Sequence, residues 1–302
     1  MRFLTFGPKG NETPGCLIDG NIISLRPLLG DQGIEWLIAH WDALRSELPA
    51  LLAEGTPIPL DKQRLGPPLL RPQKIIGVGA NYCDQDGKPP KGPIDPILFF
   101  KPASSLTGPG DPIMLPPEAA SVVAEVELVI VIGRGGRRVP PDEAMRHVFG
   151  YSMANDVTAP EVMLGDSRES PLFFQQGRGK GFPTFCPLGP WIVTADEITD
   201  PDSLLLEQAI DGSVELRGEA RLMHHKIDVL VSEVSHAFGL EPGDIILSGS
   251  PRPFAGTRRR PLQAGSMLTS SISTIGALTN PIMSEANSAH QPLRNYSGTA
   301  EY

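Results

Sequence analysis

The sequence predicts an α+β protein built mostly from short β-strands. Its 302 residues include 32 glycines and 32 prolines, the residues that favour turns. Hydrophobic residues make up 40% of the chain, which is too many for a disordered protein. Turn residues and apolar runs in these proportions indicate many short strands with turns between them, and only a few segments have helical spacing.

The first 65 residues are expected to form a small N-terminal α+β domain. Strand-like pieces occupy residues 2–7, 15–20 and 21–25. Apolar residues near helical spacing then predict a helix over residues 34–55, with Gly55 as its stop. The proline-rich stretch that follows, residues 56–73, has the composition of a connector.

Strand signals dominate the larger domain, which we place at residues 66–283. Helices are predicted at residues 141–150 and 227–239, with Gly239 of the second where a helix C-cap glycine belongs. The polar, aperiodic residues 284–302 are expected to form a flexible tail. Strands are predicted at residues 75–79, 97–101, 126–133, 150–157, 189–195, 244–250 and 266–273.

Charge and composition exclude several classes of partner. The formal net charge of −9 disfavours nucleic acid and anionic membranes, because both bind basic surfaces. Cys16, Cys83 and Cys186 are too few and too scattered for a disulfide framework or a thiolate metal site. The chain has no apolar run of membrane-spanning length and no signal-peptide core, so a soluble, cytoplasmic protein is expected.

Two acids interrupt an apolar run at residues 122–133. Glu125 and Glu127 are two apart, so on a strand they share one face and repel each other in a poorly solvated setting. An ion pair with Arg137 or Arg138 would neutralise them, and so would a divalent cation. Asp156 offers a third carboxylate, and Lys180 in a small polar loop offers a positive charge. Acid pairs on strands also occur in glycosidases, so the spacing alone does not select a reaction.

The chain resembles the fumarylacetoacetate hydrolase family over roughly residues 70–280. The resemblance implies a rolled, mixed β-sheet catalytic domain, commonly assembled as a homodimer. It also implies that Glu125, Glu127 and Asp156 hold one Mg²⁺ or Mn²⁺ and that Lys180 lies beside this metal. The segments that carry it, in family order, are IIGVGANY, ILFFKPASSLTGPGDPIMLP, EVELVIVIGRGGRRVPPDEAMRHVFGYSMANDVTA, RGKGFPTFCPLGPWIVTADEI and LEPGDIILSGSP.

The chain departs from the family where water is activated. Family hydrolases carry a histidine and, one helical turn later, a glutamate, at the positions of Gln85 and Lys88 here. Glutamine does not exchange protons near neutral pH. Glycine and two prolines interrupt this segment, so a short loop is expected in place of the family's helix. Alternatively, another residue is the base, such as His225 or His236.

The family's substrate contacts are also altered. Pro160 and Met163 stand where an arginine and a glutamine often bind a substrate carboxylate, so an anion would be held by Arg178 or Arg252. Ser250 keeps a hydroxyl where the family has a threonine. The candidate catalytic residues are therefore Lys180, Gln85 and Ser250, and the candidate substrate-binding residues are Tyr82, Arg178, Arg252 and Met163.

These features predict a divalent-metal-dependent enzyme that acts on a 1,3-dicarbonyl or 2-oxo acid through a metal-stabilised enolate. The missing histidine and glutamate favour tautomerisation, decarboxylation or cyclisation, which need no activated water. One alternative is hydrolysis of an acylpyruvate carbon–carbon bond with a displaced base. Another is a non-catalytic binding protein that retains the fold, although loss of the costly buried acids would then be expected.

Overall fold

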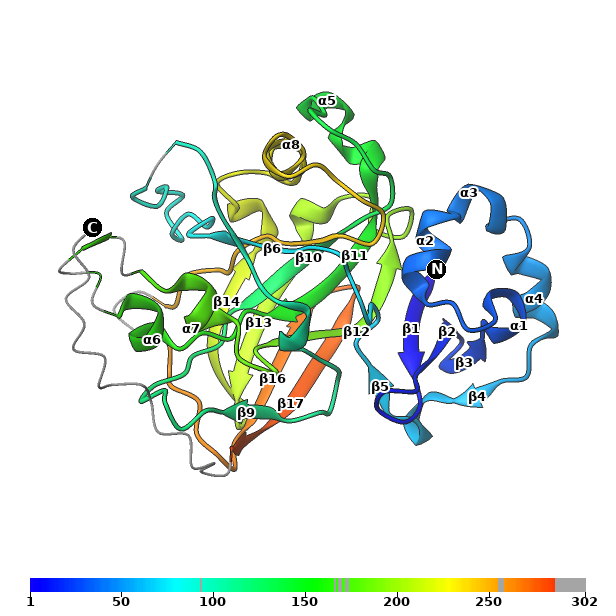
Figure 1. Ribbon diagram of the computed structural model, residues 1–302, viewed down its shortest axis with the longest axis horizontal. Helices are drawn as coiled ribbons and strands as arrows, with labels where there is room; N and C mark the ends of the chain where they lie inside the picture. The colour runs from blue at the N-terminus through cyan, green and yellow to red at the C-terminus, as the bar shows by residue number, and fades with distance from the viewer. Residues whose placement is uncertain (93, 166, 168–169, 172–173, 255–257, 286–302) are drawn as a thin grey trace, which may run out of the picture.

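The computed structural model describes residues 1–92, 94–165, 167, 170–171, 174–254 and 258–285. The protein is α+β with mostly strands, as the sequence predicts (Figure 1). Its helices are α1 (Arg26–Leu29), α2 (Ile34–Ala39), α3 (Trp41–Leu44), α4 (Leu48–Glu54), α5 (Pro141–Ala144), α6 (Pro160–Leu164), α7 (Gln176–Lys180) and α8 (Ile227–Ala237).

A large mixed sheet forms the frame of the molecule. Its strand order is β4-β3-β2-β1-β12-β11-β10-β15-β6-β7, with β5 paired to β1 and β8 to β12. Most of its pairs are antiparallel, whereas β15 and β6 run parallel. The strands are β1 (Arg2–Phe6), β2 (Thr13–Ile18), β3 (Asn21–Ser24), β4 (Ile58–Pro59), β5 (Leu65–Gly66), β6 (Ile75–Gly79), β7 (Ile97–Phe100), β8 (Leu106–Thr107), β10 (Val126–Ile132), β11 (Val148–Asn155), β12 (Cys186–Thr194) and β15 (Ile245–Leu247).

A second sheet packs against the first. Side chains from both sheets, such as Leu128, Ile130, Leu206 and Leu278, meet in the largest hydrophobic core, and Leu230 of α8 also contributes to it. The strand order is β14-β13-β16-β17-β9. These strands are β9 (Ile113–Leu115), β13 (Leu205–Ile210), β14 (Ser213–Glu219), β16 (Met267–Ile272) and β17 (Gly276–Ser284).

Strand β10 is buried on both faces, and this explains its unbroken apolar sequence. Leu128 and Ile130 point into the core between the sheets, whereas Val129 and Val131 point into a second core with the N-terminal helices. A strand covered on both sides needs apolar residues at every position, and all seven residues of β10 are buried. Glu127 is the only charged residue among them, so its position requires a specific explanation.

The N-terminal region lies at one end of the molecule, where α1 to α4 gather beside β1, β2 and β3 (Figure 1). Its strands continue the large sheet, because β1 pairs with β12. The separate domain at residues 1–65 remains a prediction, but the hydrogen-bonded sheet crosses the expected boundary. The single helix predicted for residues 34–55 is wrong: the chain forms α2, α3 and α4, and Pro49 lies in the first turn of α4.

The predicted helix at residues 227–239 is confirmed as α8, followed by Gly239 with a φ of +71°. The predicted helix at residues 141–150 is shorter, because β11 begins at Val148. Seven strands were not predicted: β4, β5, β8, β9, β13, β14 and β17. Of the predicted tail, only Ser284 and Glu285 lie among the described residues. Within the described ranges, no helix is long and apolar enough to cross a membrane.

Candidate active site

Antiparallel pairing of β10 with β11 brings the three predicted acids together. Val126 lies opposite Asn155 in this pair. Glu125 comes just before β10 and Asp156 just after β11, and the Asp156 amide donates a 2.8 Å hydrogen bond to the Glu125 carbonyl. Glu127 follows within β10. As a result, carboxylate oxygens of the three acids lie within 4.8 Å of one another.

Burial makes this cluster electrostatically costly. Glu127 and Asp156 are almost completely buried, whereas the Glu125 side chain is 26% exposed. Burial, with the nearby charges of Asp156 and Glu125, raises the pKa of Glu127 well above its ordinary value. One oxygen of Glu127 accepts a 2.6 Å hydrogen bond from the Gly249 amide. This hydrogen bond offsets only part of the effect of burial on the pKa of Glu127.

Lysines provide two of the opposing charges. Lys101 Nζ donates to Asp156 Oδ1 at 2.7 Å and also contacts the carbonyl oxygen of Lys180. Lys180 Nζ contacts Asp156 Oδ2, lies 3.4 Å from Glu125, and donates to Thr158 Oγ1 at 2.8 Å. Burial would raise the pKa of Asp156, but the charges of Lys101 and Lys180 outweigh it and lower that pKa. Burial alone would lower the pKa of Lys180. The charges of Asp156 and Glu125 raise this pKa by more, so the Lys180 ammonium group stays protonated.

Glu125 does form an ion pair with an arginine, but this arginine is neither Arg137 nor Arg138. Arg259 Nε lies 2.9 Å from Glu125 Oε1. Arg137 and Arg138 lie elsewhere: Arg137 packs beside Gly239, and the Arg138 amide bonds to the backbone near the end of α8. Ion pairing therefore neutralises Glu125 in part, while Glu127 has no cation within 4 Å among the described residues.

The donor chemistry of the cluster fits a divalent cation. Hard cations such as Mg²⁺ and Mn²⁺ prefer carboxylate oxygens, and three of these converge here. Among the described residues, no side-chain cation lies within 4 Å of Glu127, so positive charge close to this residue is lacking. A cation held by Glu125, Glu127 and Asp156 would supply it.

A small cavity of about 140 Å³ opens onto the three acids. Three further candidate residues, Tyr82, Ser250 and Arg252, line it together with Lys180. Burial raises the pKa of the Tyr82 phenol, so Tyr82 stays neutral. The remaining lining residues are Val78, Gly79, Ala80, Pro90, Phe99, Pro253 and Arg259.

Three predicted site residues do not line the cavity. Gln85 is exposed on the loop after Tyr82, and only Pro90 of that loop reaches the cavity wall. The predicted loop is confirmed, since residues 83–92 and 94–96 contain no helix. Arg178 is exposed on α7. Met163 lies on α6, where it packs against Gly179.

The two alternative bases, His225 and His236, also lie outside the cavity wall, as does Cys83. Cys83 is a free thiol whose amide bonds to the Leu222 carbonyl. The backbone of His225 pairs with the side chain of Asn81, so His225 lies near the site without lining it. His236 is on α8, with its ring bonded to the Ser232 carbonyl.

Two further residues of the site, Lys101 and Arg259, were not predicted. Lys101 is a charged residue directly after the apolar strand β7, which is a weak signal for a buried ion pair. Arg259 belongs to an arginine-rich stretch that gives no sign of its partner. Neither residue is near the acids in sequence, so only the fold reveals these contacts.

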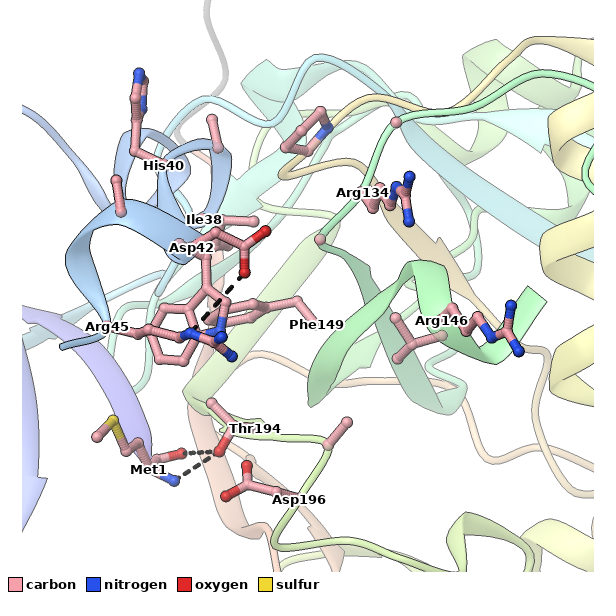
Figure 2. Close-up of a pocket in the computed structure, with 18 residues that line it drawn as sticks. Met1, Ile38, His40, Asp42, Arg45, Arg134, Arg146, Phe149, Thr194 and Asp196 are labelled. Atoms are coloured by element: carbon pink, nitrogen blue, oxygen red, sulfur yellow. Dashed lines mark hydrogen bonds and ion pairs between the residues drawn. The ribbon is translucent and has the colours of Figure 1, made fainter. Parts of the chain in front are cut away.

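A larger hollow of about 1,020 Å³ lies elsewhere, between the N-terminal helices and the main body (Figure 2). Asp42 and Arg45 lie on one wall, while Arg134 and Arg146 lie on the other. None of the three clustered acids lines this hollow. The smaller cavity is therefore the candidate active site, because it combines the acids, a buried lysine and neutral polar groups.

Comparisons with known proteins find relatives of this chain both in sequence and in structure. The family model described as Fumarylacetoacetate (FAA) hydrolase C-terminal matches residues 74–283. Oxaloacetate tautomerase fahd2, mitochondrial, of Xenopus laevis is 35% identical over 297 residues, covering 94% of this chain and 90% of the relative. The 2,4-didehydro-3-deoxy-L-rhamnonate hydrolase of a Sphingomonas strain is 37% identical over 283 residues, covering 91% of this chain and 94% of that protein.

A solved structure extends the similarity to the whole fold. The maleylpyruvate hydrolase of Sphingobium sp. SYK-6, in complex with manganese (II) ion and pyruvate, superposes with a TM-score of 0.79 and 28% identity. The match covers 95% of this chain and 100% of that one. The relatives thus include a tautomerase and hydrolases on one fold.

Proposed function

Because the chain belongs to the fumarylacetoacetate hydrolase family, we propose that it is a divalent-metal-dependent enzyme that interconverts the keto and enol forms of a 2-oxo acid. The acid cluster, with Lys180 beside it, carries this proposal: Glu125, Glu127 and Asp156 would hold Mg²⁺ or Mn²⁺. When bound, the cation supplies Lewis-acid polarisation of the substrate's carbonyl oxygen. The similarity to an oxaloacetate tautomerase supports the reaction class.

Keto–enol interconversion suits the side chains that line the cavity. The reaction transfers a proton from carbon to solvent and a proton from solvent to oxygen, and it needs no water as nucleophile. Lys180 stays cationic and lies at the cavity, so it favours negative charge on a substrate oxygen beside it. The exposed position of Gln85, away from the cavity wall, is then no obstacle.

Hydrolysis of a carbon–carbon bond is the second candidate. It is favoured by two hydrolases among the similar proteins, one by sequence and one by structure. It requires a base that activates water for attack on carbon, and none of the described residues that line the cavity is a histidine. We therefore rank tautomerisation first, with decarboxylation and cyclisation as variants that share the enol form.

The test follows the enol absorbance of oxaloacetate with added Mg²⁺, with Mn²⁺, and after chelation. We expect metal-dependent acceleration of enol decay, together with faster deuterium exchange at C3. Lys180→Met and Glu127→Gln should abolish the acceleration, and Glu118→Gln, on the exposed surface, should retain it. No acceleration by the wild-type protein with either metal, across several 2-oxo acids, would refute the proposal.

A further inference from the structure

The large hollow between the N-terminal helices and the main body has an apolar, aromatic surface. Trp41 of α3 and Phe149 of β11 pack edge to face, with ring centroids 5.1 Å apart and planes at 90°. Phe149 and Ile38 are buried, whereas Trp41 stays partly accessible, and all three line the hollow. The hollow therefore offers a surface against which a flat ring can pack.

Three arginines line the same hollow from both of its walls (Figure 2). Arg45 comes from the N-terminal helices, and Arg134 and Arg146 come from the main body. The acids that line it are Asp42 and Asp196, so arginines outnumber carboxylates among the described residues of the hollow, although the formal net charge of the chain is −9. A positive excess in a hollow of an acidic protein favours an anionic ligand.

The protein itself engages these arginines only weakly. Arg45 Nε lies 4.0 Å from Asp42 Oδ1, and Arg146 Nη1 lies 3.9 Å from Glu143 Oε1, in both cases between exposed side chains. Surface ion pairs of this kind add little stability, so a ligand anion can replace them. The Arg134 side chain has no ion-pair partner within 4 Å in the described part of the chain.

The backbone of Arg134 is held in place. Its amide donates to the His147 carbonyl at 3.3 Å, and its own carbonyl lies 2.8 Å from His147 Nδ1. His147 is buried directly before β11, so the turn that follows β10 has a fixed position. Only the side chain of Arg134 must therefore become ordered when a ligand binds, which keeps the entropic cost of binding low.

We propose that this hollow binds a nucleotide with two or more phosphate groups, at a site separate from the acid cluster. The base would pack near Trp41, and the phosphates would lie between Arg45 on one wall and Arg134 with Arg146 on the other. Arginine suits phosphate because its planar group forms paired, charge-assisted hydrogen bonds. The hollow measures about 1,020 Å³, and small-molecule sites measure roughly 300–1,000 Å³, so a nucleotide has room.

Strands β10 and β11 separate the hollow from the acid cluster. Gly133, directly after β10, and Val148, the first residue of β11, line the hollow. Glu127 and Asp156 lie near the opposite ends of the same strands. A strand rises about 3.3 Å per residue, so the seven residues of β10 span roughly 20 Å. The nucleotide site therefore does not rest on the function proposed for the acid cluster.

The test titrates the Mg²⁺-loaded protein with ADP, pyrophosphate and adenosine in a calorimeter. ADP should bind more tightly than pyrophosphate or adenosine, because only ADP uses both the arginines and the aromatic surface. Arg134→Met should weaken ADP binding by about tenfold to a hundredfold, as expected for a charge-assisted hydrogen bond. Equal affinity of the wild-type protein for ADP and pyrophosphate would overturn the nucleotide site.

Arg137→Met is the matched control. Arg137 belongs to the same turn as Arg134, is exposed, and does not line the hollow. The control should keep ADP affinity within about twofold, because surface substitutions outside a site have small effects. If the turn only attracts anions from a distance, Arg134→Met and Arg137→Met will weaken ADP binding equally. That result would overturn the inference.

Fluorescence locates the bound ligand. ADP should quench the emission of Trp41, and Trp41→Phe should remove this quenching, since Trp36 and Trp191 do not line the hollow. Glu127→Gln should keep ADP affinity within about twofold, because Glu127 lies outside the hollow. Loss of ADP binding in Glu127→Gln would place the nucleotide at the acid cluster instead. No binding of ADP by the wild-type protein, as when a second copy of the chain fills the hollow, would equally overturn the inference.

Discussion

Lys101 Nζ lies 2.7 Å from Asp156 Oδ1, and both side chains are shielded from solvent. Lys101 also contacts the backbone carbonyl of Lys180, so one ammonium group ties the end of β11 to the end of α7. Lys101 directly follows strand β7, so its two contacts fix the position of Asp156 relative to Lys180 and hold both residues to the end of that strand. The pair therefore links the fold to the chemistry of the cavity.

The first prediction concerns this pair. Lys101→Met keeps the apolar stem but leaves Asp156 with less compensation for its buried charge. Loss of one partner from a buried ion pair costs about 3–5 kcal/mol of unfolding free energy. Urea unfolding in the presence of a metal chelator measures this loss of unfolding free energy. Lys62→Met, at an exposed position, should change stability by less than about 0.5 kcal/mol. Equal stability of the two variants would contradict the role assigned to Lys101.

The second prediction concerns Glu127 in the metal-free protein. Its pKa is higher in the folded chain than in the unfolded chain, so the folded state binds more protons. Folding stability from this residue therefore falls as pH rises above the unfolded pKa of about 4.3. Glu127→Gln should be more thermostable than wild type in chelator, by a margin that grows from acid to neutral pH.

Added metal should reverse this order. A cation that binds the folded state raises the unfolding temperature of the wild-type protein, whereas Glu127→Gln loses a ligand and gains less. Thermal unfolding with and without Mg²⁺ or Mn²⁺ measures both effects, and Glu118→Gln is the exposed control. Equal metal affinity of wild type and Glu127→Gln in a calorimetric titration would remove Glu127 from the metal site.

The two glutamates of the acid cluster were predictable because they lie within one short stretch of sequence and because buried like charges cost free energy. Two glutamates in an apolar run require neutralisation, and the run itself marks a buried strand. The structure refines this picture, since β10 begins at Val126 and Glu125 lies just before it. The pairing with β11 that places Asp156 opposite Glu125 comes from the register, which single-strand patterns do not specify.

Other features have no local signal. Strand β13 buries Gln208 and strand β17 buries Asn280, so polar residues break the apolar alternation that would identify these strands. Strand β17 also contains Pro281, which argues against a strand. Arg259 reaches Glu125 through the fold alone, and the large hollow beside Arg45 forms between segments distant in sequence.

The third prediction is a homodimer in solution. Strand β7 ends the large sheet, and its Phe100 is 44% exposed. Phe238, which follows α8, is 42% exposed and its ring centroid lies 4.6 Å from that of Phe100. Exposed sheet edges and apolar patches tend to be covered, and a second copy of the chain would cover this one.

Light scattering across micromolar concentrations should give the dimer mass. Phe100→Glu should shift the protein toward the monomer, while Leu205→Glu, at an exposed site on the second sheet, should not. A constant monomer mass for the wild-type protein would disprove the dimer. A dimer that tolerates Phe100→Glu would place the interface elsewhere.

The last prediction concerns Gln85 and hydrolysis. General base catalysis contributes about a hundredfold to ten-thousandfold to a rate, and Gln85 cannot act as a base. The wild-type protein should therefore cleave acetylpyruvate poorly with metal bound, yet accelerate deuterium exchange at its C3.

Gln85→His with Lys88→Glu should restore little, because residue 85 lies on an exposed loop and does not line the cavity, so base and water would be loosely positioned. Gln32→His, also exposed and in the N-terminal region, controls for an added histidine. Efficient cleavage of acetylpyruvate by the wild-type protein would show that another residue is the base, and hydrolysis would then take first place.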